Sequence, residues 1–120
     1  MWVCILTFDL YFLQAYELLS KIPLSSHILD LLGEEENKLN EFGDLVNRER
    51  YWTVNEILKE NTAARRALVI KKMIKVALSC VEIYNFNSAF AIVSGLGHCV
   101  VSRLRASWDK VSSLAGLDLN

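Results

Sequence analysis

The stretch NFNSAFAIVSGLGHCVVSRLRASW, residues 85–108, contains two apolar segments separated by Gly-Leu-Gly. It begins with an apolar run of small residues. Asn85 or Asn87 can cap this run as a helix, because an asparagine side chain accepts a hydrogen bond from a free backbone amide. Gly95 and Gly97 are expected to end the helix. The apolar residues after the turn recur every three or four positions and predict one face of a second helix: Val101, Leu104, Trp108 and Val111.

Helices are also expected upstream, because a single proline and five glycines leave few breaks in 120 residues. A helix is predicted from Asn37 to Lys59, followed at Asn61-Thr62 by a stop and a new N-cap. The clearest helical pattern runs from Ala63 to Tyr84. One apolar stripe on it is formed by Ala67, Ile70, Ile74, Ala77 and Val81, and a second apolar row beside it by Val69, Met73, Val76 and Cys80.

The N-terminal region is expected to be helical as well. A first helix is predicted from Ile5 to Lys21 and ends before Pro23, because proline disfavours a helical residue before it. Three polar residues interrupt its apolar run and argue against a membrane span: Asp9, Gln14 and Glu17. A short helix over HILDLLG, residues 27–33, follows. The sequence thus predicts an all-α fold, a multi-helix bundle of about six helices with little or no sheet.

Composition indicates a packed globular domain. Hydrophobic residues make up 52% of the chain and charged residues 22%, with a net charge of −1. This balance gives no reason to expect nucleic acid or an anionic membrane surface as the main partner. The three cysteines, Cys4, Cys80 and Cys99, form no C-x-x-C pair, so neither a disulfide framework nor a zinc site is suggested. A reducing, cytoplasmic compartment is the simplest interpretation.

No motif for covalent chemistry stands out. Gly95-Leu96-Gly97 begins like a dinucleotide fingerprint, but Val100 occupies the position of the third glycine. His98 beside Cys99 suggests a thiol–imidazole pair, although adjacent residues on a helix do not face each other, which favours a loop or surface histidine. The run GEEENK is interpreted as a solvated loop or first helical turn, with a carboxylate metal site as the alternative. We therefore expect no catalytic residue, no metal and no cofactor.

Residues 85–111, NFNSAFAIVSGLGHCVVSRLRASWDKV, closely resemble the signature of the catalytic domain of Ras guanine-nucleotide exchange factors, the RasGEF family. Members of that family read Asn-Phe-Asn-Ser, then A-I-V-S-G-L, a short variable turn and S-R-L-x-x-T/S-W. Upstream, LVNRERYWTVNEIL and RRALVIKKMIKVALSC are similar to two helices of the family, and YELLSKIP resembles its helix ending in Ile-Pro. The resemblance runs from about Leu6 to Val111, with gaps near residues 30–45.

The resemblance implies a function that needs a shaped surface and no covalent chemistry. RasGEF domains are wholly helical and bind Ras-like small GTPases, and they hold the switch regions in a conformation that cannot grip nucleotide and magnesium. The chain is therefore expected to promote GDP release as a regulator rather than an enzyme. Its expected partner is Ras, Rap or Ral, with no nucleic acid and no direct membrane span. A cytoplasmic location with recruitment to membranes through other domains or partners is expected.

The resemblance also implies roles for individual residues. The wall that receives the GTPase's switch II segment is expected to include Asn47, Phe90, Leu96, Gly97 and Ser102. A packing surface is expected from Phe90, Ile92, Val93 and Leu96, beside a glycine turn that lets a partner approach closely. A second set matches the family motif and is expected to be mainly structural, through capping, buried hydrogen bonds and core packing: Trp52, Asn85, Asn87, Arg103 and Trp108.

In the RasGEF family, the helical hairpin that pries switch I open lies C-terminal to this signature. Residues 1–120 are therefore expected to form a partial RasGEF catalytic domain that lacks this hairpin, keeps part of the switch II surface and has little exchange activity. The alternative is a non-catalytic helical protein-binding module or decoy that keeps the RasGEF fold.

Overall fold

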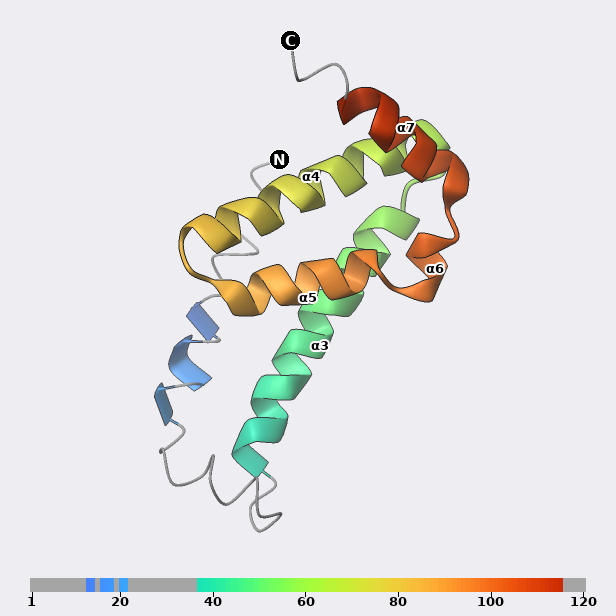
Figure 1. The fold of residues 1–120 in the computed structure, drawn as a ribbon. Coiled ribbons are helices and arrows are strands. Elements are labelled where there is room, and N and C mark those ends of the chain that lie inside the picture. The colour runs from blue at the N-terminus through green and yellow to red at the C-terminus, as the bar shows by residue number, and fades with distance from the viewer. Residues whose placement is uncertain (1–12, 15, 19, 22–36, 116–120) are drawn as a thin grey trace. The chain divides into compact units, whose positions relative to one another are not determined.

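The computed structural model describes residues 13–14, 16–18, 20–21 and 37–115 of the chain. The chain divides into two compact units, residues 1–48 and residues 49–120, and each is described by itself. The elements are α3 (Asn37–Leu58), α4 (Ala63–Glu82), α5 (Phe86–Leu96), α6 (Cys99–Ser102) and α7 (Arg105–Ala115) (Figure 1). These described stretches contain helices and no strand, so the predicted all-α class is confirmed.

The first unit contains the start of α3 and a few helical residues of the predicted first helix. Residues 13–14, 16–18 and 20–21 are helical, and the Lys21 Nζ lies 2.7 Å from the Glu17 Oε1, one turn away. The rest of the predicted helix from Ile5 to Lys21 lies outside the described residues, as do HILDLLG and most of the run GEEENK. Helix α3 begins at Asn37 as predicted and ends at Leu58, one residue before the predicted end.

Helix α4 begins where the sequence predicted a new N-cap. The Thr62 Oγ1 accepts a 3.3 Å hydrogen bond from the Arg65 amide, which satisfies one of the free donors of the first turn. Most of the predicted stripe is buried or half-buried, and Met73 and Cys80, predicted beside it, are buried as well, whereas Val81 is 45% exposed. The prediction for Val81 is therefore wrong, because the buried face turns toward Met73 and Cys80 at the C-terminal end of α4.

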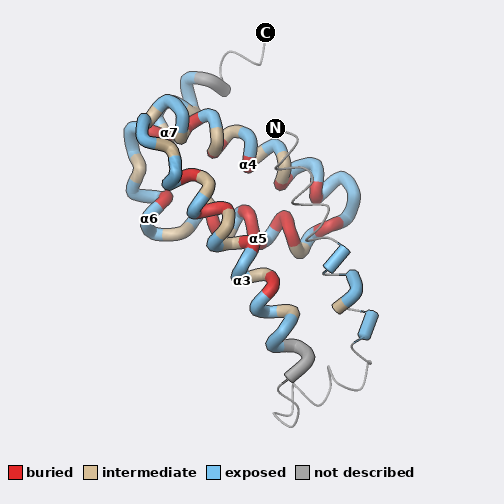
Figure 2. The backbone as a smooth tube through the Cα atoms, turned by 180° about the vertical axis from the view of Figure 1, so that it is seen from behind, coloured by how far each residue is buried: buried red, intermediate tan, exposed pale blue. Residues whose placement is uncertain are grey.

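Helix α5 lies beside α4, and Figure 2 shows buried and exposed positions recurring along both helices. Asn85 is the N-cap, since its Oδ1 accepts a 3.3 Å hydrogen bond from the Ser88 amide. The prediction that Gly95 ends this helix is wrong, because Gly95 lies inside α5 and Gly97 is the C-cap. A Cβ at Gly95 would lie 2.8 Å from the Arg50 carbonyl oxygen and 2.9 Å from the Thr53 Cβ. Glycine therefore allows α5 to touch α3.

The predicted second helix after the glycines is broken into α6 and α7. The break falls at Arg103 and Leu104, yet the predicted apolar face is kept across it. Val101 is completely buried in an apolar cluster with Val54, Ile57 and Ile70. The partly buried side chains that pack against this cluster are Val69, Ile74, Leu96, Leu104, Trp108 and Val111. The cluster joins the C-terminal half of α3 to α4, α6 and α7.

Candidate functional site

Helix α5 has one buried face and one exposed apolar face. Its buried residues are Ser88, Ala89, Ala91, Ile92 and Gly95. On the other side, Phe86, Phe90 and Val93 follow one another at spacings of four and three and are 59%, 70% and 58% exposed. We call these three residues the α5 stripe. Exposed apolar side chains that gather on one face are typical of protein-binding surfaces.

The predicted contact residues near the end of α5 differ in exposure. Leu96 is half-buried and packs against the apolar cluster, whereas Gly97 is exposed as the C-cap. Ser102 is exposed at the end of α6, where its hydroxyl donates a 3.1 Å hydrogen bond to the Cys99 carbonyl oxygen. Ile92, expected in the packing surface, is completely buried. That expectation is wrong because Ile92 falls on the inner face of α5.

Asn47, the remaining predicted contact residue, is exposed on α3. It belongs to the first compact unit, whereas the α5 stripe belongs to the second. Its place on the expected switch II wall therefore stays a prediction.

A polar network is buried on the inner side of α5. The Asn85 Nδ2 donates a 3.0 Å hydrogen bond to the Ser88 Oγ, which in turn donates a 3.5 Å hydrogen bond to the Glu49 Oε1 on α3. The Glu49 side chain is completely buried, and burial raises its pKa from 4.5 to about 7, with the Ser88 hydrogen bond opposing this in part. Nearby, the Thr53 hydroxyl donates a 3.1 Å hydrogen bond to the Glu49 carbonyl oxygen.

The sequence interpretation missed Glu49, although its spacing carries a signal. Leu45, Glu49, Thr53 and Ile57 follow one another at intervals of four along α3, and each is at most 1% exposed. Residues four apart lie on the same face of a helix. A glutamate on this face between apolar residues is therefore predictable as a buried carboxyl group.

The residues that match the family motif occupy different environments. Trp108 is half-buried, and its Nε1 donates a 3.0 Å hydrogen bond to the Val101 carbonyl oxygen. Asn85 is the buried N-cap described above. Asn87 is half-buried, and its Nδ2 has no hydrogen-bond partner among the described residues. Trp52 is half-buried on α3, and Arg103 is exposed between α6 and α7.

His98 lies between α5 and α6 and not within a helix, so the predicted loop histidine is confirmed, although its ring does approach Cys99. It is the N-cap of α6, and its Nδ1 lies 3.5 Å from the Val100 amide nitrogen and 3.9 Å from the Cys99 Sγ. The His98 ring also makes an edge contact with Tyr51, at 6.0 Å between ring centroids. The Arg50 guanidinium lies 4.8 Å from the same Tyr51 ring. These contacts account for His98 as a cap that packs against α3.

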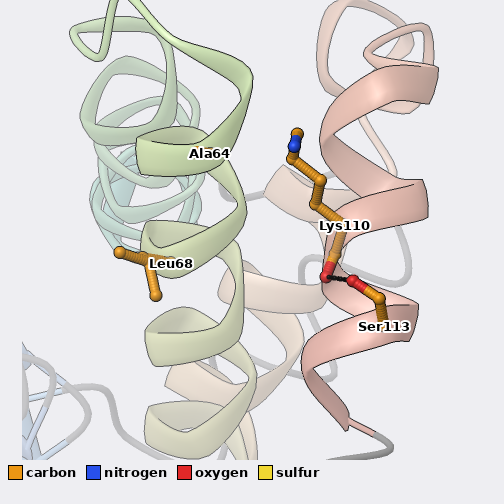
Figure 3. A pocket seen from close by; sticks show the side chains of 4 residues that line it. All are labelled: Ala64, Leu68, Lys110 and Ser113. Atoms are coloured by element: carbon orange, nitrogen blue, oxygen red, sulfur yellow. Dashed lines mark hydrogen bonds between the residues drawn. The ribbon is translucent and has the colours of Figure 1, made fainter.

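A hollow of about 240 Å³ lies between α4 and α7 and is lined by Ala64, Leu68, Lys110 and Ser113 (Figure 3). The Ser113 hydroxyl already donates a 2.8 Å hydrogen bond to the Lys110 carbonyl oxygen. None of the predicted contact residues lines this hollow. Within the described part of the chain, no group of three or more metal-binding side chains comes together. Every helix there is too short or too polar to span a lipid bilayer.

An all-helical unit with an apolar stripe on its surface has the form of a helical interaction domain. The family model for the RasGEF domain matches residues 8–118, which is nearly the whole chain. The chain therefore belongs to the RasGEF family.

Curated relatives are similar over much of this chain. A Rap guanine nucleotide exchange factor of Caenorhabditis elegans is 53% identical over 76 residues, or 63% of this chain and 5% of the relative. Rap guanine nucleotide exchange factor 6 of Homo sapiens is 40% identical over 105 residues, or 84% of this chain and 7% of the relative. Ras guanine nucleotide exchange factor D of Dictyostelium discoideum is 38% identical over 100 residues, or 81% of this chain and 15% of the relative. The chain thus spans only a small part of each relative.

Proposed function

We propose that this chain takes part in guanine-nucleotide exchange on a Ras- or Rap-type small GTPase. It acts as a regulator that binds the GTPase and promotes GDP release, without covalent chemistry of its own. Membership of the RasGEF family supports this proposal, as do the names of the relatives, which are Rap and Ras exchange factors. Because two of these relatives are named for Rap, a Rap-type GTPase is the first partner to test and Ral the last.

The physical basis is linkage between two binding reactions. A protein that prefers the nucleotide-free form of a GTPase weakens its hold on nucleotide, and nucleotide weakens the protein's binding by the same factor. Such a protein needs a surface that fits one conformation of the GTPase better than the other. Shape and apolar contact supply that preference.

The α5 stripe is the structural observation that supports a binding surface for the GTPase. Phe90 is 70% exposed on a helix whose opposite face is packed against the rest of the second unit. Keeping two phenylalanines and a valine on the outside is unfavourable for an isolated domain, and a partner that covers them gains the apolar burial. We assign the switch II contact to this stripe together with Leu96, Gly97 and Ser102, while the role of Asn47 rests on the family resemblance alone.

The same proposal covers the place of action. A cytoplasmic location, with recruitment to a membrane through other domains or partners, suits a regulator of Ras-like GTPases.

Binding and exchange assays with purified Rap, Ras and Ral test the proposal. The chain is expected to bind at least one nucleotide-free GTPase, and fluorescent GDP release reports whether it also accelerates exchange. Phe90→Ala is expected to weaken binding at least tenfold, because truncating an aromatic side chain that becomes buried in an interface costs about 2 kcal/mol or more.

Leu78→Ala is the matched control, since Leu78 is a similarly exposed apolar residue (59%) on α4, outside the α5 stripe. Equal losses in both variants would contradict the assignment of the site. Binding with little acceleration of GDP release would agree both with the low exchange activity expected from the sequence and with the non-catalytic module, whereas no binding to any of the three GTPases would overturn the proposed function.

A further inference from the structure

A buried carboxyl group lies where α5 meets α3. Glu49 is 0% exposed, and its Oε1 accepts one long hydrogen bond of 3.5 Å from the neutral Ser88 hydroxyl. Its Oε2 has no hydrogen-bond partner among the residues that the structure describes. A carboxylate buried there loses its hydration and accepts only one long hydrogen bond, so burial favours the neutral, protonated form.

Glu49 is connected to the start of α5 by a chain of hydrogen bonds. Asn85, the N-cap, donates to the Ser88 hydroxyl and accepts from the Ser88 amide, and Ser88 donates to Glu49. Near the other end of the helix, Gly95 lies against Arg50 and Thr53 with no room for a Cβ. Helix α5 therefore touches α3 at two places, and the first of them is the hydrogen bond from Ser88 to Glu49.

The charged groups on the neighbouring parts of the chain do not offset the effect of burial on the pKa of Glu49. On α3 its neighbours are Arg48, which is exposed, and Arg50, whose guanidinium lies over the Tyr51 ring. Helix α5, with the sequence FNSAFAIVSGL, has no charged or titratable side chain. Helix α4, which packs against α5, carries Arg65, Arg66, Lys71, Lys72, Lys75 and Glu82 as its charged residues. None of these is a cause of the raised pKa of Glu49. Burial raises this pKa, and the hydrogen bond from Ser88 opposes the rise in part.

We propose that Glu49 is a proton-linked positioning residue, which holds α5 against α3 while it keeps its proton and loosens this junction when it loses it. The raised pKa of about 7 places the change near neutral pH. Loosening lets water reach the carboxylate, which removes the cost of burying an anion. A consequence for binding rests on the proposed function: the α5 stripe is then held less firmly, and affinity for the GTPase falls as pH rises.

Amide hydrogen exchange of the full chain at pH 6 and pH 8 tests the junction directly. The exchange rate of each α5 amide is divided by the rate of the same amide in Glu49→Gln at the same pH, which removes the intrinsic pH dependence of exchange. The ratio is expected to rise about tenfold from pH 6 to pH 8, because an opening that exposes Glu49 restores its ordinary pKa of 4.5. Ratios for those amides of α7 that exchange by local opening, without unfolding of the whole unit, are expected to change less.

Two further variants make the test specific. Glu56→Gln removes another α3 carboxylate, one paired with Lys59, and is expected to leave the pH dependence of α5 unchanged. Ser88→Ala removes the hydrogen bond that lowers the pKa of Glu49, so the change is expected at higher pH. A constant ratio in α5 would overturn the proposal. An equal rise in α5 and in those α7 amides that exchange by local opening would also overturn it, since it would show a change throughout the unit and not at the α3–α5 junction.

A binding experiment separates this inference from the proposed function. The affinity for nucleotide-free Rap is expected to be several-fold weaker for the natural chain than for Glu49→Gln at pH 8 and nearly equal at pH 6. Equal affinities at both values would overturn the link to binding. Absence of binding to Rap, and to Ras and Ral as well, at both pH values would overturn the proposed function, while the exchange ratios still decide the behaviour of the α3–α5 junction.

Discussion

Two contacts in the second unit hold helices together by different means. The apolar cluster around Ile70 joins α3, α4, α6 and α7 through aliphatic side chains and Trp108. The junction between α3 and α5 instead depends on Glu49, Ser88 and a close backbone approach at Gly95. Apolar packing is insensitive to pH, whereas a buried carboxyl group is not. The helix that carries the α5 stripe packs against α4 and, through Leu96, against the apolar cluster, so its contact with α3 is the one part of its packing that we propose to change with pH.

The largest effect is expected in the apolar cluster. Ile70 is completely buried, and Ile70→Ala leaves a cavity as well as losing apolar burial. The free energy of unfolding is expected to fall by about 2–5 kcal/mol, measured by urea denaturation. Leu78→Ala, at an exposed position of the same helix, is the control and is expected to change it by about 0.5 kcal/mol or less. Similar losses in both variants would show that this cluster is not the core.

The next largest effect is a loss of stability through Glu49 that depends on pH, unlike the loss at Ile70. Glu49 binds its proton more tightly in the folded chain than in the unfolded one, so stability falls as pH rises from 4.5 through about 7. Above pH 7 the loss amounts to about 3 kcal/mol, which Glu49→Gln is expected to recover. Urea denaturation at pH 5 and pH 8 measures this, and Ile70→Ala should show the same deficit at both. A pH-independent gain in Glu49→Gln would contradict the buried-carboxyl assignment.

A smaller effect is expected at the second contact between α3 and α5. Gly95→Ala places a Cβ 2.8 Å from the Arg50 carbonyl oxygen, which forces backbone to move. We expect the free energy of unfolding to fall by about 1–3 kcal/mol. Gly97→Ala is the matched control, since its nearest neighbour would be the Val93 carbonyl oxygen at 3.5 Å. If thermal unfolding shows both variants equally stable, the close approach of the two helices is wrong.

The smallest effects are expected at the helix caps. Thr62→Ala removes one hydrogen bond at the exposed start of α4 and is expected to cost about 1 kcal/mol. Asn85→Ala is expected to cost more than Thr62→Ala, because Asn85 is buried and also donates to Ser88. Thermal unfolding of the two variants side by side gives the order, and the reverse order would weaken the case for the Asn85–Ser88–Glu49 network.

The sequence predicted features with a local cause. Helix periodicity marked α4, the motif Asn61-Thr62 marked its cap, and the apolar spacing found the face shared by Val101 and Trp108. It did not predict that Gly95 lies inside a helix, because the need for a glycine there comes from the close approach of α3, which is far away in the sequence. For the same reason, Ile92 could not be separated from Phe90 and Val93 until its packing was visible. The family resemblance supplied the expected partner, which no local pattern contains.

Hydroxyl-radical footprinting of the chain, with and without nucleotide-free Rap, tests most directly the claim that the α5 stripe is the binding surface. We expect Phe86 and Phe90 to be protected in the complex, whereas Leu68 and Leu78, which are 50% and 59% exposed on α4, keep their reactivity. Protection of Leu68 and Leu78 with unchanged reactivity at Phe86 and Phe90 would contradict it and move the binding surface to α4.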